Sequence, residues 1–294
     1  MIFNKGYIAE GILSSAMYLK LKERTFSVDE LKKFIVEQLQ EENHSINLDY
    51  TLRLSNNNFI SLKDSKLVNN FSGIYKNSFD FAHSYFFNNV ENKINPDDNI
   101  ILLSDGIVDQ KTSKCDIAIS KNIEPILKIN LKCNSRTIHQ SGSSFEKMQF
   151  LFNKFGVEIN RFENGFYKDV SNYREIFSFF ANLLNNVSSE KIFDAIKYFA
   201  TLNDEQLLEV KFNTRNFEIF NYNQLDYNLN LYSMLNKNSL RPNIVIMDRE
   251  SNKKLFQTRL EVRKNGTYIK NIMIEKGIAL KELTRIKHGA DFKF

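Results

Sequence analysis

The chain has 294 residues, which is enough for one large or two modest domains and for a substantial hydrophobic core. Hydrophobic residues make up 42% of it and charged residues 26%, and the 3 Pro and 10 Gly exclude a collagen-like chain and a Pro/Gly-rich disordered one. Forty Lys and Arg against 35 Asp and Glu give a net charge of +5, which suits a polyanionic partner but arises equally from a Lys-rich solvated surface.

Two further classes of protein are disfavoured by the same sequence. Neither a CxxC pair nor a His at ligand spacing accompanies Cys115 and Cys133, which argues against a disulfide scaffold and a zinc site. No apolar run approaches the roughly 20 residues that span a bilayer. We therefore expect a cytoplasmic protein without a membrane partner.

The N-terminal part of the chain predicts helices around one strand. Apolar residues recur at helical spacing over 8–21, and the capping-box sequence of 27–30 opens a second helix. Alternation over 46–54 predicts a half-buried strand, and helical periodicity returns over 78–94.

The middle of the chain predicts adjacent strands of one sheet. Short apolar runs over 100–103, 115–119 and 125–132 are separated by polar turns, and a helix follows over 143–155. Residues 1–160 are therefore expected to form an α/β core of a small mixed sheet flanked by helices.

The remaining residues, 161–294, predict a helical segment and a C-terminal β-hairpin that packs back on the core. Helical periodicity extends over 170–210. A strand is expected over 243–247, and β-rich arms flank Asn265-Gly266, a dipeptide that strongly favours a hairpin turn. Lys and Arg residues make this hairpin positive, which suits phosphate contacts and suits protection of an edge strand equally well.

Asp116 and Lys132 lie on neighbouring predicted strands. Asp116 begins one apolar run and Lys132 ends the next, so a carboxylate and an ammonium group come side by side at one end of the sheet. A carboxylate can hold a divalent metal ion, and a lysine can orient the attacking water and stabilise a scissile phosphate. The pair predicts phosphodiester hydrolysis, although a Lys-rich chain also produces such pairs by chance.

This arrangement resembles the core of the PD-(D/E)xK nuclease superfamily, which includes many restriction endonucleases. The resemblance covers about the first 155 residues and implies that Asp116 and Lys132 are catalytic and that Mg²⁺ is the cofactor. Asn130 stands where the family has its second acid, so it would be a neutral metal ligand and one metal-binding charge would be missing.

Two glutamates would complete the site that the resemblance implies. Glu146, at the start of the helix after the lysine strand, would bind the metal and restore the missing charge. Glu10, on the first helix, would reach the metal directly or through water. The alternative for Glu10 is an N-terminal position favoured by the helix dipole.

Other polar residues have candidate roles in binding. Asp105 and Asp109 are expected either to form a β-turn or to be further metal ligands. The residues expected to contact DNA phosphates are Ser135, Arg136 and Gln140 in the loop after the lysine strand, and Arg259, Arg263 and Lys264 in the hairpin. An ordinary solvated loop is the alternative for the first three.

Together these features predict a Mg²⁺-dependent DNA endonuclease, a type II restriction-like enzyme of bacterial or phage origin. Because family members often cut duplexes as homodimers, a homodimer is expected. A catalytically inactive nucleic-acid-binding or phage structural protein with the same fold is the alternative, and Asn130 argues for it. An interaction protein whose motif is coincidental is a third possibility.

Overall fold

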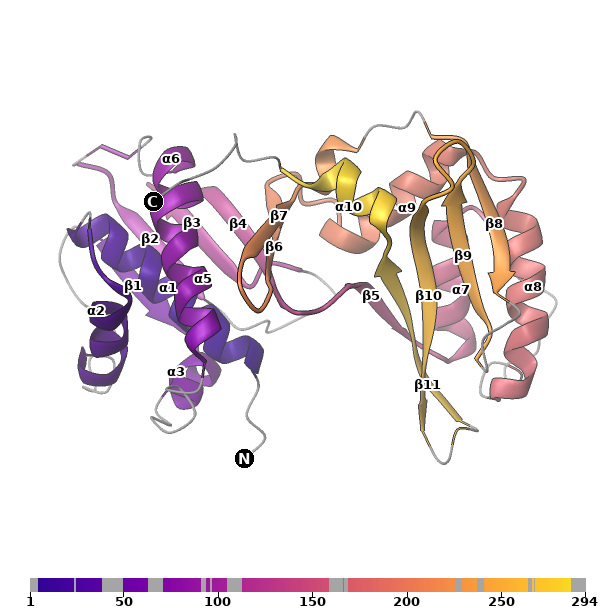
Figure 1. Ribbon diagram of the computed structural model, residues 1–294, viewed down its shortest axis with the longest axis horizontal. Helices are drawn as coiled ribbons and strands as arrows, with labels where there is room; N and C mark the ends of the chain where they lie inside the picture. The colour runs from indigo at the N-terminus through magenta and orange to yellow at the C-terminus, as the bar shows by residue number, and fades with distance from the viewer. Residues whose placement is uncertain are drawn as a thin grey trace. The chain divides into compact units, whose positions relative to one another are not determined.

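The computed structural model describes residues 5–23, 25–38, 50–62, 71–90, 94–95, 97–104, 113–158, 166, 169–225, 229–236, 241–263, 266 and 268–286 (Figure 1). The chain is mixed α/β, as predicted, with two sheets that are flanked by helices. It divides into two compact units. Unit 1 comprises Met1–Ser135, Asp204–Asn221 and Ile286–Phe294, and unit 2 comprises Arg136–Asn203 and Tyr222–Arg285.

The described residues of unit 1 form a mixed six-stranded sheet with the strand order β1-β2-β3-β4-β6-β7. The strand pairs β1/β2 and β4/β6 are parallel, and the other neighbours are antiparallel. The strands are β1 (Tyr50–Leu54), β2 (Ile100–Ser104), β3 (Ile117–Lys121), β4 (Glu124–Cys133), β6 (Leu207–Phe212) and β7 (Phe217–Phe220).

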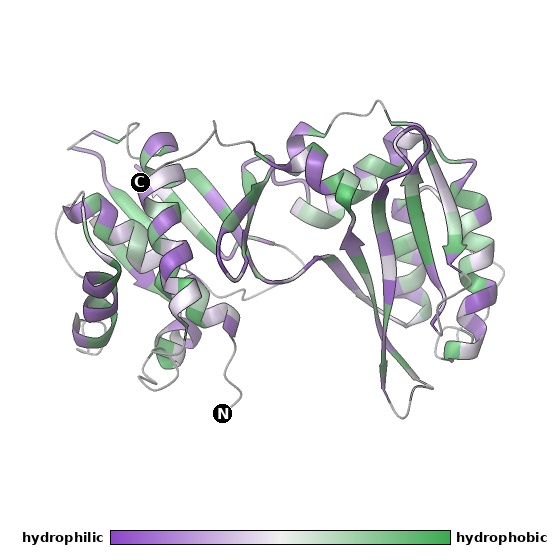
Figure 2. Cartoon of the chain, in the orientation of Figure 1, coloured by the Kyte–Doolittle hydropathy of each residue, from purple (hydrophilic) through white to green (hydrophobic). Residues whose placement is uncertain are grey.

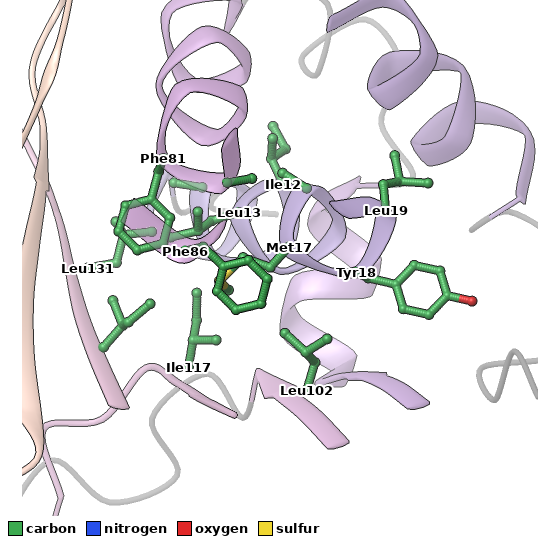
Figure 3. Packing of buried hydrophobic residues seen from close by; sticks show 14 of the residues in the cluster. Ile12, Leu13, Met17, Tyr18, Leu19, Phe81, Phe86, Leu102, Ile117 and Leu131 are labelled. Atoms are coloured by element: carbon green, nitrogen blue, oxygen red, sulfur yellow. The ribbon is translucent and has the colours of Figure 1, made fainter. Parts of the chain in front are cut away.

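One helix, α1 (Lys5–Glu23), lies at the centre of the core of unit 1 and contacts β1, β2 and β4. It is buried from Ile8 to Leu21 because strands and other helices surround it. The other helical segments are α2 (Val28–Lys33), η1 (Phe34–Gln38), α3 (Asn56–Leu62), α5 (Ser72–Phe81), η2 (Ala82–Phe86) and α6 (Phe87–Asn89). Figure 3 shows the apolar side chains of α1 meeting those of the strands and of the α5–η2 segment.

Unit 2 has an antiparallel sheet with the strand order β5-β11-β10-β9-β8 in its described residues. Helices α7 and α9 contact β5, α8 contacts β8 and β9, and α10 contacts β10. The strands are β5 (Thr137–Gly142), β8 (Leu231–Asn236), β9 (Asn243–Asp248), β10 (Lys254–Arg263) and β11 (Tyr268–Lys276). The helical segments are α7 (Phe145–Lys154), η5 (Val170–Asn172), α8 (Tyr173–Leu184), α9 (Ser189–Thr201), η6 (Tyr222–Gln224) and α10 (Ile278–Thr284).

Hydropathy follows the position of each element in its unit. Figure 2 shows β9, which lies inside its sheet, as mostly hydrophobic and the short helix α2 as mostly hydrophilic. Among the described residues, no helix combines the length and apolar character needed to cross a membrane.

Several predicted elements are confirmed. The helix over 8–21 is α1, the three central strands are β2, β3 and β4, and the hairpin is β10–β11. That hairpin belongs to the sheet of unit 2, where β10 also pairs with β9 and β11 also pairs with β5. The hairpin thus pairs with β5, which lies within residues 1–160, in a sheet separate from that of β2, β3 and β4.

The compact units do not follow the predicted division at residue 160. The chain leaves unit 1 after β4 and returns to it at Asp204 to form β6, which pairs with β4 in parallel. A parallel neighbour requires a long crossover connection, and β5, α7, α8 and α9 lie within that connection.

The prediction of helix over 170–210 is wrong at its C-terminal end. Helix α9 ends at Thr201, and Leu202 and Asn203 have positive φ angles of 52° and 64°. Left-handed residues cannot continue an α-helix, so the chain turns there and begins β6 at Leu207.

Candidate functional site

Asp116 is anchored at the point where β3 begins beside β4. Its backbone N–H donates to the carbonyl of Ile129 at 2.7 Å, and its carboxylate accepts a 2.6 Å hydrogen bond from the N–H of Leu131. The side chain thus takes a position that a strand carbonyl would occupy if the backbone ladder continued. Asp116 is 3% exposed. The start of the strand therefore fixes this carboxylate against the lysine strand, as the sequence predicts.

Glu10 is held in place on α1 by Asn58 of α3. Asn58 Nδ2 donates to Glu10 Oε2 at 3.0 Å and to the carbonyl of Tyr7 at 2.9 Å, while its Oδ1 accepts from Ser104 Oγ at 3.1 Å. Asn58 is fully buried, so it links α1, α3 and the end of β2 within the core.

Gly11 allows α3 to come this close to α1. A Cβ at Gly11 would lie 2.6 Å from Leu62 Cδ1, which is closer than real contacts allow without movement of the leucine. The absence of a side chain at Gly11 therefore helps to place Asn58 beside Glu10.

Burial and neighbouring charge shift the pKa of both carboxyl groups. Burial, together with the charge of Asp116, raises the pKa of Glu10 to about 7, whereas Asn58 and Lys132 act in the opposite direction. Burial raises the pKa of Asp116 to about 6, against the lowering effects of Lys132, the Leu131 N–H and Lys114. The two acids and Lys132 therefore act on one another electrostatically, although they come from three different elements.

Three polar residues lie in a row across three strands on one face of the sheet. Ile117 pairs with Ile129, so Asp116 comes next to Asn130 on β4. Asn130 pairs in turn with Glu209 on β6. Side chains alternate along a strand, so Lys132 and its register partner Lys211 lie on this same face.

Asn130 has an unsatisfied buried oxygen. The residue is 3% exposed, and its Oδ1 makes no hydrogen bond. Leaving a buried polar atom without a partner has a cost in free energy, which a cation or a donor from a ligand would remove. Asn130 therefore suits the role of a neutral metal ligand that the sequence predicts for it.

Sequence reasoning missed Lys114 and Glu209. Burial lowers the pKa of Lys114 to about 8, with Lys132 acting in the same direction and Asp116 and Glu209 opposing it. Lys114 therefore belongs to this charged group. Its position two residues before Asp116 was an available signal, whereas Glu209 was hidden because its segment was predicted to be helical.

Glu146, which is predicted to restore the missing charge, lies in a different compact unit from this group. It is exposed on α7 of unit 2, whereas Asp116, Asn130 and Lys132 belong to unit 1. The reason is the path of β5, which pairs with β11 and takes the following helix into the second unit. The residue beside Asn130 that can contribute an acid is Glu209 instead.

The residues predicted to contact phosphate after the lysine strand are divided between the two units. Ser135 ends the first segment of unit 1, whereas Arg136 and Gln140 begin unit 2, where Gln140 pairs with Met273 on β11. The boundary between the units thus falls within this segment, because the chain passes from unit 1 to unit 2 after Ser135.

Part of the positive charge of the hairpin is paired with acidic residues. Arg259 forms a 2.6 Å ion pair with Glu275, which lies across the hairpin. Arg263, at the end of β10, is exposed and lowers the pKa of Glu261 after the larger effects of Asn271 and Lys270. Acidic partners thus offset part of the hairpin charge. Lys264, Asp105 and Asp109 lie outside the described residues.

The metal-binding potential of the group rests on two carboxylates and an amide. In the described part of the chain, no three His, Cys, Asp or Glu side chains come together closely enough to hold a metal ion. Mg²⁺ commonly uses only one or two protein carboxylates and completes its coordination with water and substrate phosphate. Glu10 and Asp116 are the carboxylates that could serve in this way, and the Asn130 oxygen is a possible neutral ligand. No protein-family model, curated protein or solved structure matches the chain.

Proposed function

We propose that the protein is a Mg²⁺-dependent DNA endonuclease whose site comprises Glu10, Asp116, Asn130 and Lys132. The observation that carries the proposal is the convergence of two buried acids and a lysine, each from a different element of unit 1. Buried charges without a structural ion-pair partner are costly, and strongly shifted pKa values gather at functional sites.

Each residue has a role that follows from its environment. Glu10, Asp116 and the unpartnered oxygen of Asn130 would hold the ion, with Glu209 as the neighbouring acid. A bound Mg²⁺ would polarise the scissile phosphate and lower the pKa of a bound water. Lys132 would orient the water and stabilise the negative charge that develops on the phosphate. The water oxygen bonds to phosphorus and the bond from phosphorus to the leaving oxygen breaks, giving a phosphate monoester and a hydroxyl group.

The proposal includes a homodimer, since two such sites related by a two-fold axis would allow both strands of a duplex to be cut in one binding event. It also places the enzyme in the cytoplasm of a bacterial or phage-infected cell, where its DNA substrate would be.

Asn130 favours a second candidate function. With an amide in the place of an acid, the chain would keep a nucleic-acid-binding surface without hydrolysing its ligand, as an inactive binding or phage structural protein would. Such a protein would bind DNA in a salt-dependent way and would not bind a divalent metal at this group.

Metal binding separates the two candidates. We expect calorimetric titration with Mn²⁺, which prefers the same oxygen ligands as Mg²⁺, to show one site in the wild-type protein at pH 8. Asp116→Asn and Glu10→Gln should weaken binding at least tenfold, and the control Glu146→Gln should leave it unchanged. Absence of binding, or equal binding in all four proteins, would overturn the proposed metal site. Salt-sensitive DNA binding in EDTA would then select the second candidate.

A further inference from the structure

A second feature of unit 1 is a pocket of about 930 Å³. The start of α1, the first two turns of α5, the end of β4 and the turn between β6 and β7 line it. Its volume is near the upper end of the usual range for small-molecule sites, about 300–1,000 Å³. The pocket is therefore large enough for a nucleotide.

The wall between α5 and the β6–β7 turn is built closely. Asn77 of α5 donates through Nδ2 to the carbonyl of Asn213 at 2.7 Å. A Cβ at Gly73 would lie 3.1 Å from the carbonyl oxygen of Thr214, so a glycine lets the helix approach the turn. These contacts fix the turn that carries Arg215 against the helix that carries Lys76.

The lining combines aromatic rings with positive charge. Phe71, Phe79 and Phe212 contribute aromatic side chains, and Lys5 Nζ lies 5.8 Å from the centre of the Phe71 ring. Among the lining residues the acid is Asp80, and it forms an ion pair with Lys76. The charges of Lys5 and Arg215 thus have no acidic counterpart in the lining. This combination suits a ligand with a planar apolar part and an anionic part.

Cys133 lines the pocket at the end of β4. It directly follows Lys132, so the two side chains lie on opposite faces of the strand. Burial raises the pKa of its thiol to about 11, and the charges of Lys5, Glu10, Asp116 and Lys132 all act on it as well. The thiol is therefore neutral at pH 7 and adds no charge to the pocket, which lies within electrostatic range of the proposed site.

We propose that this pocket binds an unpaired nucleotide, with its base among the phenylalanines and its phosphate near Lys5 and Arg215. The proposal rests on the proposed function and specifies the substrate as a nucleic acid with a single-stranded or locally opened segment. A base inside a duplex is paired and stacked, so it cannot enter a pocket without leaving the helix.

Binding measured in EDTA tests the pocket without cleavage. The probe is a fluorescent single-stranded 12-mer, compared by anisotropy with the duplex of the same sequence and with competing deoxyadenosine monophosphate. We expect the single strand to bind more tightly than the duplex, and Phe71→Ala and Arg215→Ala to weaken it about tenfold. Arg174→Ala, which removes an exposed arginine of α8 in unit 2, is the matched control and should have no effect.

The result that would overturn the proposal is equal affinity for single strand and duplex, or unchanged affinity in Arg215→Ala. Arg215 is exposed in a turn, so its variant should fold even if Phe71→Ala does not, and circular dichroism checks both. If deoxyadenosine monophosphate displaces the single strand at low concentration, the result supports the pocket as a nucleotide site and identifies a free nucleotide as its ligand.

The two proposals fail separately. If Mn²⁺ binding is intact but Phe71→Ala and Arg215→Ala do not weaken single-strand binding, only the pocket proposal is contradicted. Nucleotide binding without metal binding would contradict the nuclease and leave the pocket proposal supported.

Discussion

Glu10 lowers the stability of the fold at neutral pH, because its carboxyl group is buried. Its pKa is about 7 in the folded chain, against 4.5 for the ordinary group. Between these pH values the folded state binds more protons than the unfolded state, so the free energy of unfolding falls as the pH rises. Above pH 7 the free energy of unfolding stays lower by the full cost of burying the charged carboxylate. Asp116, whose pKa is about 6, acts in the same direction over a lower range.

Glu10→Gln should therefore flatten the pH dependence of stability. The amide keeps an oxygen that can accept from Asn58 and removes the buried charge. We expect the difference in unfolding free energy between pH 5 and pH 8 to shrink by on the order of 2 kcal/mol, measured by urea unfolding in EDTA. Glu146→Gln, at an exposed position, is the control. An unchanged slope in Glu10→Gln would contradict the buried, shifted carboxyl group.

Asn58 is the residue on which the position of Glu10 depends. Asn58→Ala removes hydrogen bonds to Glu10, Tyr7 and Ser104 inside the core. We expect a loss of about 1–3 kcal/mol in stability by thermal or urea unfolding, because buried partners are left unsatisfied. Asn57→Ala, on the exposed side of α3, should change stability little. Equal effects of the two variants would show that the network contributes nothing.

At the residue scale, the sequence allowed part of the site to be predicted. Asp116 and Lys132 could be found because they lie at the ends of two consecutive apolar runs, and Glu10 because it interrupts an apolar helix. Asn58 could not be found, since it is 48 residues from Glu10 and no periodic pattern connects them. Glu209 could not be found because its neighbour Asn130 is brought to it only by parallel pairing.

At the element scale, local patterns were sufficient where they were strong. The capping box of α2 is an example: Ser27 Oγ accepts from the N–H of Glu30 at 3.2 Å, and Glu30 Oε2 accepts from the N–H of Ser27 at 2.6 Å. Both bonds follow from a four-residue signature that is visible in the sequence.

Ser27→Ala should destabilise this end of unit 1. Loss of a serine N-cap costs about 1 kcal/mol in typical helices, so the midpoint of urea unfolding should fall without a change in slope. Thr25→Ala, two residues earlier and exposed, provides the comparison. A midpoint as high as that of Thr25→Ala would mean that the cap does not stabilise the folded chain.

Local patterns could not predict the path of β5. Its sequence is short and polar, and its partner β11 follows it by more than a hundred residues. Which sheet β5 joins is decided by tertiary pairing, and that choice carries α7 and Glu146 into unit 2. The same choice explains why the predicted boundary at residue 160 differs from the two units.

At the scale of the whole molecule, the class of fold follows from composition and alternating patterns, while the discontinuous units do not. Unit 1 is completed only when the chain returns for β6 and β7. The proposed site uses residues on α1, before β3 and on β4, with Glu209 on the returning strand. The first 155 residues therefore contain most of the proposed site but not the strand that borders it.

The most direct test of the central proposal is cleavage of supercoiled plasmid DNA. The purified protein is incubated with the plasmid in Mg²⁺ or in EDTA, alongside Asp116→Ala, Lys132→Ala and the control Lys128→Ala, which removes a lysine paired with Asp204 on the same strand face. We predict Mg²⁺-dependent cutting that both site variants lose and that the control retains. No cutting by the wild-type protein, or equal cutting by all four proteins, would contradict a nuclease site at Glu10, Asp116 and Lys132.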